Sequence, residues 1–276
     1  MSDTVLPPLS KLIFPAYLTF IRGIKISDDD IKISQEFSNV TIDVDNLEAY
    51  KEYFNFKSQL PVTYIYIVAQ RALLHLMLHK EFTIAVPGIV HISNEVQLTA
   101  QFNIDEKIEI KASIHVPVKE GSLFPKAEII FYQKGVEVAR NISNYIAKRK
   151  SPKKSSKRKE NVSTFGLDSF REEWVIEKSI GKSYAQLSQD KNPIHTSKLF
   201  AKMIGFKRPI AHGWYSVNRV VSVAEKENNC TFKSIRVAFN KPIYLPSKVQ
   251  FQLNDGNQFK VTNPYKAYTY LEGDLS

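Results

Sequence analysis

The sequence of 276 residues has a single cysteine and no long apolar run. Cys230, being alone, excludes an internal disulfide and leaves a zinc site little to be built from. No stretch approaches the roughly 18 apolar residues that cross a bilayer. Residues 1–14 contain prolines but lack the apolar segment and cleavage site of a secretory signal. These absences predict a globular, cytoplasmic protein with no membrane span and no metal.

Three common catalytic or cofactor motifs are also missing. The chain contains no G-x-S-x-G nucleophile elbow, no G-x-G-x-x-G dinucleotide loop and no G-x-x-x-x-G-K-[ST] phosphate loop. A serine hydrolase of that type and a nucleotide-dependent enzyme are therefore disfavoured, and no cofactor is predicted.

Positive charge is plentiful but unevenly spread. The net charge is +10, and eight cations fall within residues 148–159; without them the net charge is +2. A near-neutral remainder lacks the basic face of a nucleic-acid-binding protein. Serines and a proline interrupt the basic run, which is typical of a solvated linker. A docking patch for an acidic carrier protein or for the phosphates of coenzyme A is the alternative.

Apolar periodicity predicts the same plan in both halves of the chain. Residues 61–79 form an apolar stripe with helical spacing, and strand patterns follow between residues 89 and 146. Residues 211–225 again read as a central helix, followed by strands between 234 and 271. The proline-rich residues 1–20 are predicted to be a strand or a loop.

Matching features recur at a nearly constant offset. Pro61 and Pro209, which precede the two long helices, lie 148 positions apart, and Asn94 and Asn240, predicted to close the next strand, lie 146 apart. We therefore predict two units, residues 1–147 and 166–276, joined by a linker at 148–165. No histidine precedes His75, so the first unit has no counterpart of the acid–histidine pair described next.

One irregular loop in the second unit combines an acid with an imidazole. Asp190 stands five positions before His195, and the intervening Asn192-Pro193 breaks any helix. Two such groups on a rigid loop can hold one water molecule between them. The helix that begins near Gly213 would present unpaired backbone N–H groups to a developing oxyanion.

The residues 187–213 resemble a known family signature. S-x-D-x-N-P-I-H at 188–195 and G-F-x-x-P-I-A-H-G at 205–213 are similar to the motifs of MaoC-like dehydratases and (R)-specific enoyl-CoA hydratases. Gln189 and Trp214 depart from the glycine and the aliphatic residue common there. The resemblance implies an α+β fold, two tandem hot-dog units that form an intramolecular double hot-dog. Such a chain is expected to be a monomer or a homodimer.

The resemblance also implies an activity, the reversible hydration of trans-2-enoyl thioesters of coenzyme A or acyl carrier protein to (R)-3-hydroxyacyl thioesters. Asp190 and His195 would hold the water, with Asp190 favoured as its base and His195 as the proton-transfer partner, and the Gly213 N–H would bind the thioester oxygen. Asn192, Ser188, Trp214 and Pro209 are the predicted substrate-binding residues, while His212 is predicted to be structural. A thioesterase and a non-catalytic module that binds acyl thioesters or a partner protein are the alternatives.

Overall fold

The computed structural model describes residues 5–22, 29–117, 122–147 and 169–276. The predicted basic linker at 148–165 lies outside these residues. Within them, no helix is long and apolar enough to cross a bilayer.

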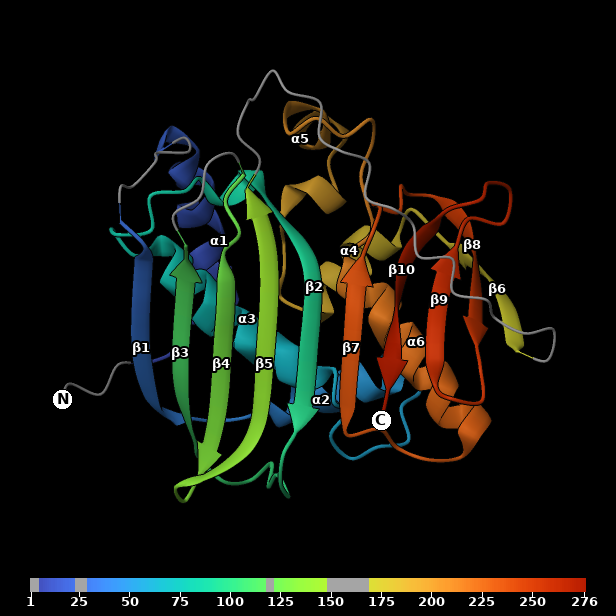
Figure 1. The fold of residues 1–276 in the computed structure, drawn as a ribbon, viewed down its shortest axis with the longest axis horizontal. Coiled ribbons are helices and arrows are strands. Elements are labelled where there is room, and N and C mark those ends of the chain that lie inside the picture. Colours follow the sequence, from blue (N-terminus) through green and yellow to red (C-terminus); the bar gives the residue numbers. More distant parts are fainter. Residues whose placement is uncertain (1–4, 23–28, 118–121, 148–168) are drawn as a thin grey trace.

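Ten strands form one antiparallel sheet, in the order β1-β3-β4-β5-β2-β7-β10-β9-β8-β6 (Figure 1). The strands of the first half are β1 (Ile31–Val40), β2 (Ile89–Leu98), β3 (Ile108–Val116), β4 (Lys126–Gln133) and β5 (Val136–Ala147). Those of the second half are β6 (Phe170–Ile176), β7 (Ser234–Phe239), β8 (Ser247–Leu253), β9 (Gln258–Thr262) and β10 (Thr269–Leu275).

The two halves meet at the centre of this sheet. Strands β2 and β7 pair antiparallel from Ser93 opposite Ala238 to Gln97 opposite Ser234. Moving outward from the centre, the order is β2, β5, β4, β3, β1 on one side and β7, β10, β9, β8, β6 on the other. Each strand of the first half therefore lies as far from the centre as its counterpart in the second half. This symmetry confirms the predicted α+β architecture of two tandem units. Asn94 was predicted to end its strand, which is wrong: it lies within β2, opposite Val237.

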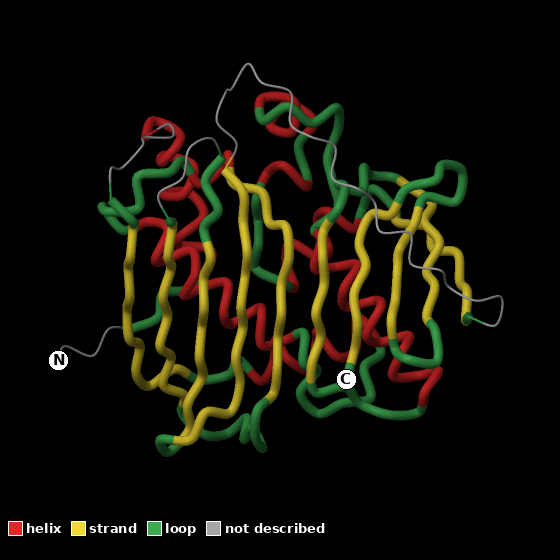
Figure 2. Tube along the Cα trace, in the orientation of Figure 1, coloured by secondary structure: helices red, strands yellow, loops and turns green. Residues whose placement is uncertain are grey.

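A long helix from each half packs behind the sheet. Helices α3 (Tyr64–Leu78) and α6 (Gly213–Asn228) lie on the same side of it (Figure 2). Ten of the fifteen residues of α3 are buried, so nearly its whole circumference is covered, as its composition predicts. Each large apolar side chain buried in this way contributes about 1.5–3 kcal/mol to folding.

Shorter helices surround the two central ones. They are α1 (Leu9–Leu18), α2 (Val44–Phe54), α4 (Ile180–Leu187) and α5 (Lys198–Met203), with 3-10 turns η1 (Thr19–Arg22), η2 (Val86–Gly88) and η3 (Pro193–His195).

The helix α1 corrects the prediction that residues 1–20 form a strand or a loop. Pro8 sits at the N-cap, where a missing N–H and a fixed φ are tolerated. Leu9, Leu12 and Ala16 then share the buried face of the helix. From α3, the Arg71 guanidinium donates to the carbonyls of Leu6 and Pro7 at 2.8 and 3.1 Å, which anchors the start of α1 over the first unit.

Candidate active site

Local hydrogen bonds set the shape of the Asp190 loop. Helix α4 ends at Leu187, and the buried Ser188 hydroxyl donates to the Tyr184 carbonyl at 2.7 Å while accepting from the Asp190 N–H at 3.3 Å. Gln189 has a φ of 59°, in the left-handed region that favours glycine. Gln189, which stands where the family commonly has glycine, therefore has a backbone conformation that glycine would adopt more easily.

The turn η3 presents His195 in one tautomer. Asn192 caps this turn, its side-chain oxygen accepting from the Ile194 N–H at 3.1 Å. The Nδ1 of His195 is 2.8 Å from the Ile210 carbonyl oxygen. Because a carbonyl can only accept, Nδ1 carries the proton and Nε2 keeps its lone pair.

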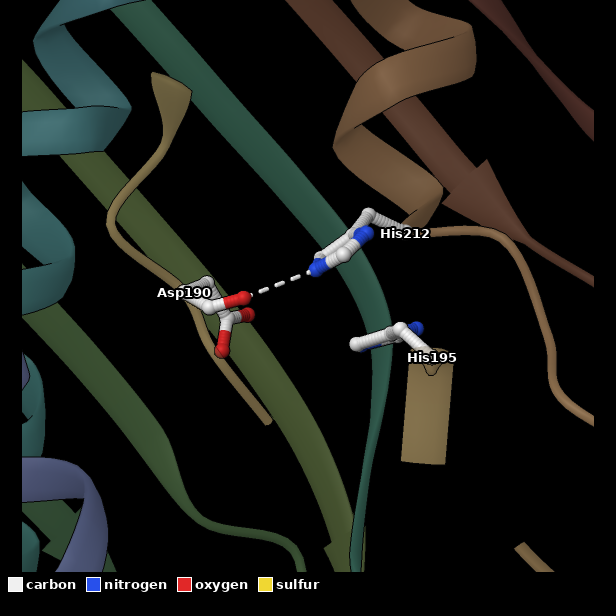
Figure 3. A group of neighbouring side chains, drawn as sticks. All are labelled: Asp190, His195 and His212. Carbon is white, nitrogen blue, oxygen red and sulfur yellow. Dashed lines mark hydrogen bonds between the residues drawn. The ribbon is translucent and has the colours of Figure 1, made fainter. Parts of the chain in front are cut away.

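Asp190, His195 and His212 converge at one point (Figure 3). One side-chain oxygen or nitrogen from each lies within 4.8 Å of the others. The imidazoles of His195 and His212 stack with their centroids 3.5 Å apart, and His212 Nε2–H donates to the backbone carbonyl of Asp190 at 3.0 Å. One water molecule, with hydrogen bonds of about 2.8 Å, can bridge two acceptors at this spacing.

Burial keeps the two imidazoles neutral. Desolvation lowers the pKa of His195, and the nearby Asp190 carboxylate opposes this only in part. Desolvation, with His195 as a close neighbour, lowers the pKa of His212 to about 3. Near pH 7 the site therefore holds neutral imidazoles, of which His195 offers a basic nitrogen.

The three groups form the one cluster of metal-ligating type among the residues that the structure describes. Their geometry suits proton transfer better than a metal. Imidazole lone pairs lie in the ring plane, so stacked rings direct them side by side and not toward one ion about 2 Å from each nitrogen.

The first half of the chain also reaches into the site. Gln70 of α3 donates from its amide to Asp190 Oδ2 at 3.1 Å. The Tyr17 hydroxyl of α1 donates a short hydrogen bond to the side-chain oxygen of Asn192. Both contacts were missed by the sequence analysis. They join residues 120 and 175 positions apart, and no local pattern marks them.

A cavity of about 210 Å³ opens beside Asp190 and Asn192 and extends into the first half. Its remaining walls come from α1, α3, the segment after it and strands β2 and β5. The apolar members are Ile13, Ala16, Leu73, Leu74, Met77, Val86, Pro87 and Ile89. Tyr66, His91 and Tyr145 form a polar end, where the His91 ring stacks on Tyr145 with 4.6 Å between centroids.

Three of the predicted substrate-binding residues, Ser188, Trp214 and Pro209, are not on the walls of this cavity. Trp214 is buried, with its indole N–H donating to the Thr63 carbonyl at 2.9 Å. Pro209 is buried, and its carbonyl accepts from the Leu245 N–H at 2.9 Å. Ser188 is occupied by the loop bonds described above. Of the four predicted substrate-binding residues, Asn192 alone is part of the lining.

Gly213 is the first residue of α6, as expected for a donor at a helix start. The structure gives a reason for glycine here that the sequence did not. A Cβ at this position would lie 2.9 Å from Cε1 of Phe239, so the space that a side chain would need is filled by that ring.

Part of the chain is similar in sequence to known proteins. Residues 160–272 match the model of the MaoC like domain, a segment that contains Asp190, His195 and Gly213. The carboxy-terminal part of this chain is a MaoC-like domain. Over 93 residues the chain is 31% identical to 3-hydroxyacyl-thioester dehydratase X of Mycobacterium tuberculosis. That alignment covers 33% of this chain and 33% of the relative.

Solved structures extend the likeness to both halves. The crystal structure of HtdX from Mycobacterium tuberculosis superposes with a TM-score of 0.73 at 19% identity, over 88% of this chain and 99% of that one. A further protein of that organism, described as having a double hotdog fold, covers 92% of this chain and 98% of its own length with a TM-score of 0.58 and 8% identity. The two halves of this chain thus together have a double hot-dog fold.

Proposed function

We propose that the protein hydrates trans-2-enoyl thioesters reversibly to 3-hydroxyacyl thioesters. The observation that carries the proposal is the approach of Asp190 and His195 within reach of one water molecule, beside the cavity. The MaoC-like domain and a relative named as a 3-hydroxyacyl-thioester dehydratase support it.

In the proposed reaction, the Asp190 carboxylate and Nε2 of His195 each accept a hydrogen bond from the water. The water oxygen attacks the β-carbon of the enoyl group as Asp190 takes up one proton, which then passes to the α-carbon. The second hydrogen remains on the new hydroxyl group. His195 orients the water through its hydrogen bond and assists Asp190 in the proton transfer. Both groups end in their starting protonation states.

Negative charge develops on the thioester oxygen during the attack. We assign its stabilisation to the backbone N–H of Gly213, which lies at the amino end of α6, where the helix dipole favours an anion. The N–H adjoins His212, so donor and proton-transfer groups belong to one continuous cluster.

The acyl chain is assigned to the cavity in the first half. Apolar side chains from α1 and α3 form most of its lining, and its polar end and the Asp190 loop border the reacting carbons. This division explains why a unit without its own acid–histidine pair is retained. We infer the (R) configuration of the product from the family resemblance, and the carrier is coenzyme A or acyl carrier protein.

An absorbance assay of enoyl-thioester loss, with chromatography of the product, tests the activity. Substrates with 4 to about 16 carbons should be offered on both carriers. The expected product is the (R)-3-hydroxyacyl thioester. Release of free thiol without a hydroxyacyl product would indicate a thioesterase instead, and tight binding without turnover would indicate a binding module.

A further inference from the structure

A second cavity, of about 410 Å³, lies against helix α6 in the other half of the molecule. Its walls come from the end of α2 and from one face of α6. The lining residues are Tyr53, Phe54, Asn55, Tyr215, Arg219, Ser222, Val223 and Lys226.

This cavity is the pseudo-symmetric counterpart of the active-site cavity. Helices α3 and α6 begin at Tyr64 and Gly213, 149 positions apart. Applying the same offset to the five α3 residues of the first cavity gives the five α6 residues of the second. The pairs are Tyr66 and Tyr215, Gln70 and Arg219, Leu73 and Ser222, Leu74 and Val223, and Met77 and Lys226. Each central helix therefore lines a hollow with the same face, although the remaining walls of the two hollows come from different elements.

The lining of the second hollow is more basic than that of the first. Where the first has Gln70 beside the Asp190 carboxylate, the second has Arg219, and where the first has Met77 deep in its apolar wall, the second has Lys226. Its lining includes two cations and no carboxylate. Phe54, Tyr215 and Val223 keep part of the wall apolar.

Contacts within the protein hold the Arg219 guanidinium in place, but no carboxylate forms a close ion pair with it. Its guanidinium lies over the ring of the buried Trp174, 4.6 Å from the centroid. The carboxylate of Glu172 is 3.9 Å away, at the outer limit of an ion pair. Ser222 donates its hydroxyl to the Phe54 carbonyl, which joins the two walls. The site is thus partly built before any ligand arrives.

We propose that this second hollow binds an organic anion, with a carboxylate or phosphate group at Arg219 and Lys226 and an apolar body against Phe54 and Tyr215. It is a binding site without catalysis, because it has no acid–histidine pair. Arginine and lysine together suit either anionic group, so the chemical class is an amphipathic monoanion or dianion.

Tryptophan fluorescence can report on this site alone. The chain has two tryptophans, so Trp214→Phe leaves Trp174, which touches Arg219. This variant is titrated with octanoate, octyl phosphate, inorganic phosphate and 1-octanol. Octanoate or octyl phosphate should give a saturable change, and the comparison of the two identifies the preferred anionic group. Octanol, which lacks the charge, and phosphate, which lacks the apolar body, should bind at least about ten-fold more weakly.

Charge removal supplies the decisive comparison. Arg219→Met with Lys226→Met should weaken the saturable binding at least about ten-fold, and Lys226→Glu, at an exposed position that leaves the core intact, should weaken it similarly. Lys107→Met with Lys126→Met, which removes two exposed charges in the first half, is the control and should change nothing. Enoyl-thioester hydration, measured in the chain with both tryptophans, should be unaffected by all of these charge variants. Equal binding of octanol, or unchanged octanoate and octyl phosphate binding in Lys226→Glu, would overturn the proposal and leave the hydratase assignment untouched.

Discussion

The amide of Gln70 donates a hydrogen bond to the carboxylate of Asp190, 3.1 Å away, and so links the central helix of one half to the Asp190 loop of the other. The second carboxylate oxygen, Oδ1, accepts a hydrogen bond from within the loop, from the Asn192 N–H at 3.2 Å. Both oxygens are thus held, one from each half of the molecule. The first unit, which has no acid–histidine pair of its own, thus holds the acid of the second unit.

Gln70→Leu removes the bond from the first unit and keeps a similar volume. A hydrogen bond to a charged group is worth about 1.5–3 kcal/mol, so kcat should fall about 10- to 100-fold. KM should change less than about three-fold, because the acyl chain keeps its contacts. Steady-state kinetics across two chain lengths measures both parameters. A KM effect with normal kcat would show that Gln70 binds substrate and does not position Asp190.

Buried imidazoles should make folding sensitive to acid. Burial lowers the pKa of His195, and it lowers those of His91 and His212 to about 3. Their unfolded values lie near 6.5, so the unfolded chain binds protons first as the pH falls. The contribution of these histidines to the free energy of unfolding is fully present above about pH 6.5. It is lost progressively toward pH 3, by up to about 1.4 kcal/mol per pH unit for each histidine.

Urea unfolding between pH 7.5 and 4.5 measures this slope. His91→Phe preserves an aromatic ring between Tyr66 and Tyr145 and should remove the contribution of one histidine. Val90→Ala, at a non-titrating side chain 47% exposed on the same strand, serves as the control and should leave the slope as it is. Identical slopes for His91→Phe and the unsubstituted protein would contradict the assignment of His91 as a buried neutral group.

Gly213→Ala should destabilise the fold through Phe239. The added methyl group would approach Cε1 to 2.9 Å, and overpacking of this kind costs about 1–3 kcal/mol. Thermal or urea unfolding measures the loss. Phe239→Leu should recover most of it in the double variant because the ring edge is gone. A Gly213→Ala protein as stable as the parent would show that Phe239 moves aside freely.

Met77→Trp should shorten the acyl chains that the enzyme accepts. Met77 lines the part of the cavity formed by α3, so a larger ring there reduces the space for an acyl chain. We expect kcat/KM to fall at least about ten-fold for the longest substrates and to stay within about two-fold for crotonyl thioester. Val136→Trp, at a residue 56% exposed, is the matched control. A uniform loss at every length would argue against the cavity as the acyl site.

Local patterns in the sequence were enough to predict the central helices and the pairing of Asp190 with His195. The helices follow from apolar periodicity, and the pair from two polar groups separated by a helix-breaking Asn192-Pro193. The helix α1 was missed because prolines at positions 7, 8 and 15 mask its apolar repeat. Pro15 nevertheless stands inside the helix, where packing on α3 outweighs its poor helix propensity.

Contacts between the halves could not be predicted in this way. Gln70 and Tyr17 reach the site only after the chain has folded back on itself, and no pattern near either residue signals a partner more than 100 positions away. The packing of Phe239 on Gly213, within the second half, likewise depends on how the folded strand meets the helix. The domain boundaries, the absence of a metal, the cytoplasmic location and the oligomeric state remain predictions.

The claim on which the account depends is that Asp190 and His195 act on one shared water. Asp190→Asn and His195→Gln keep the size and polarity of each side chain, and they should each lower kcat for crotonyl-thioester hydration by about 10²–10⁴-fold with little change in unfolding temperature. The double variant should be scarcely slower than the worse single one, because the two groups form one unit. Hydration at the parent rate by either folded variant would contradict the account.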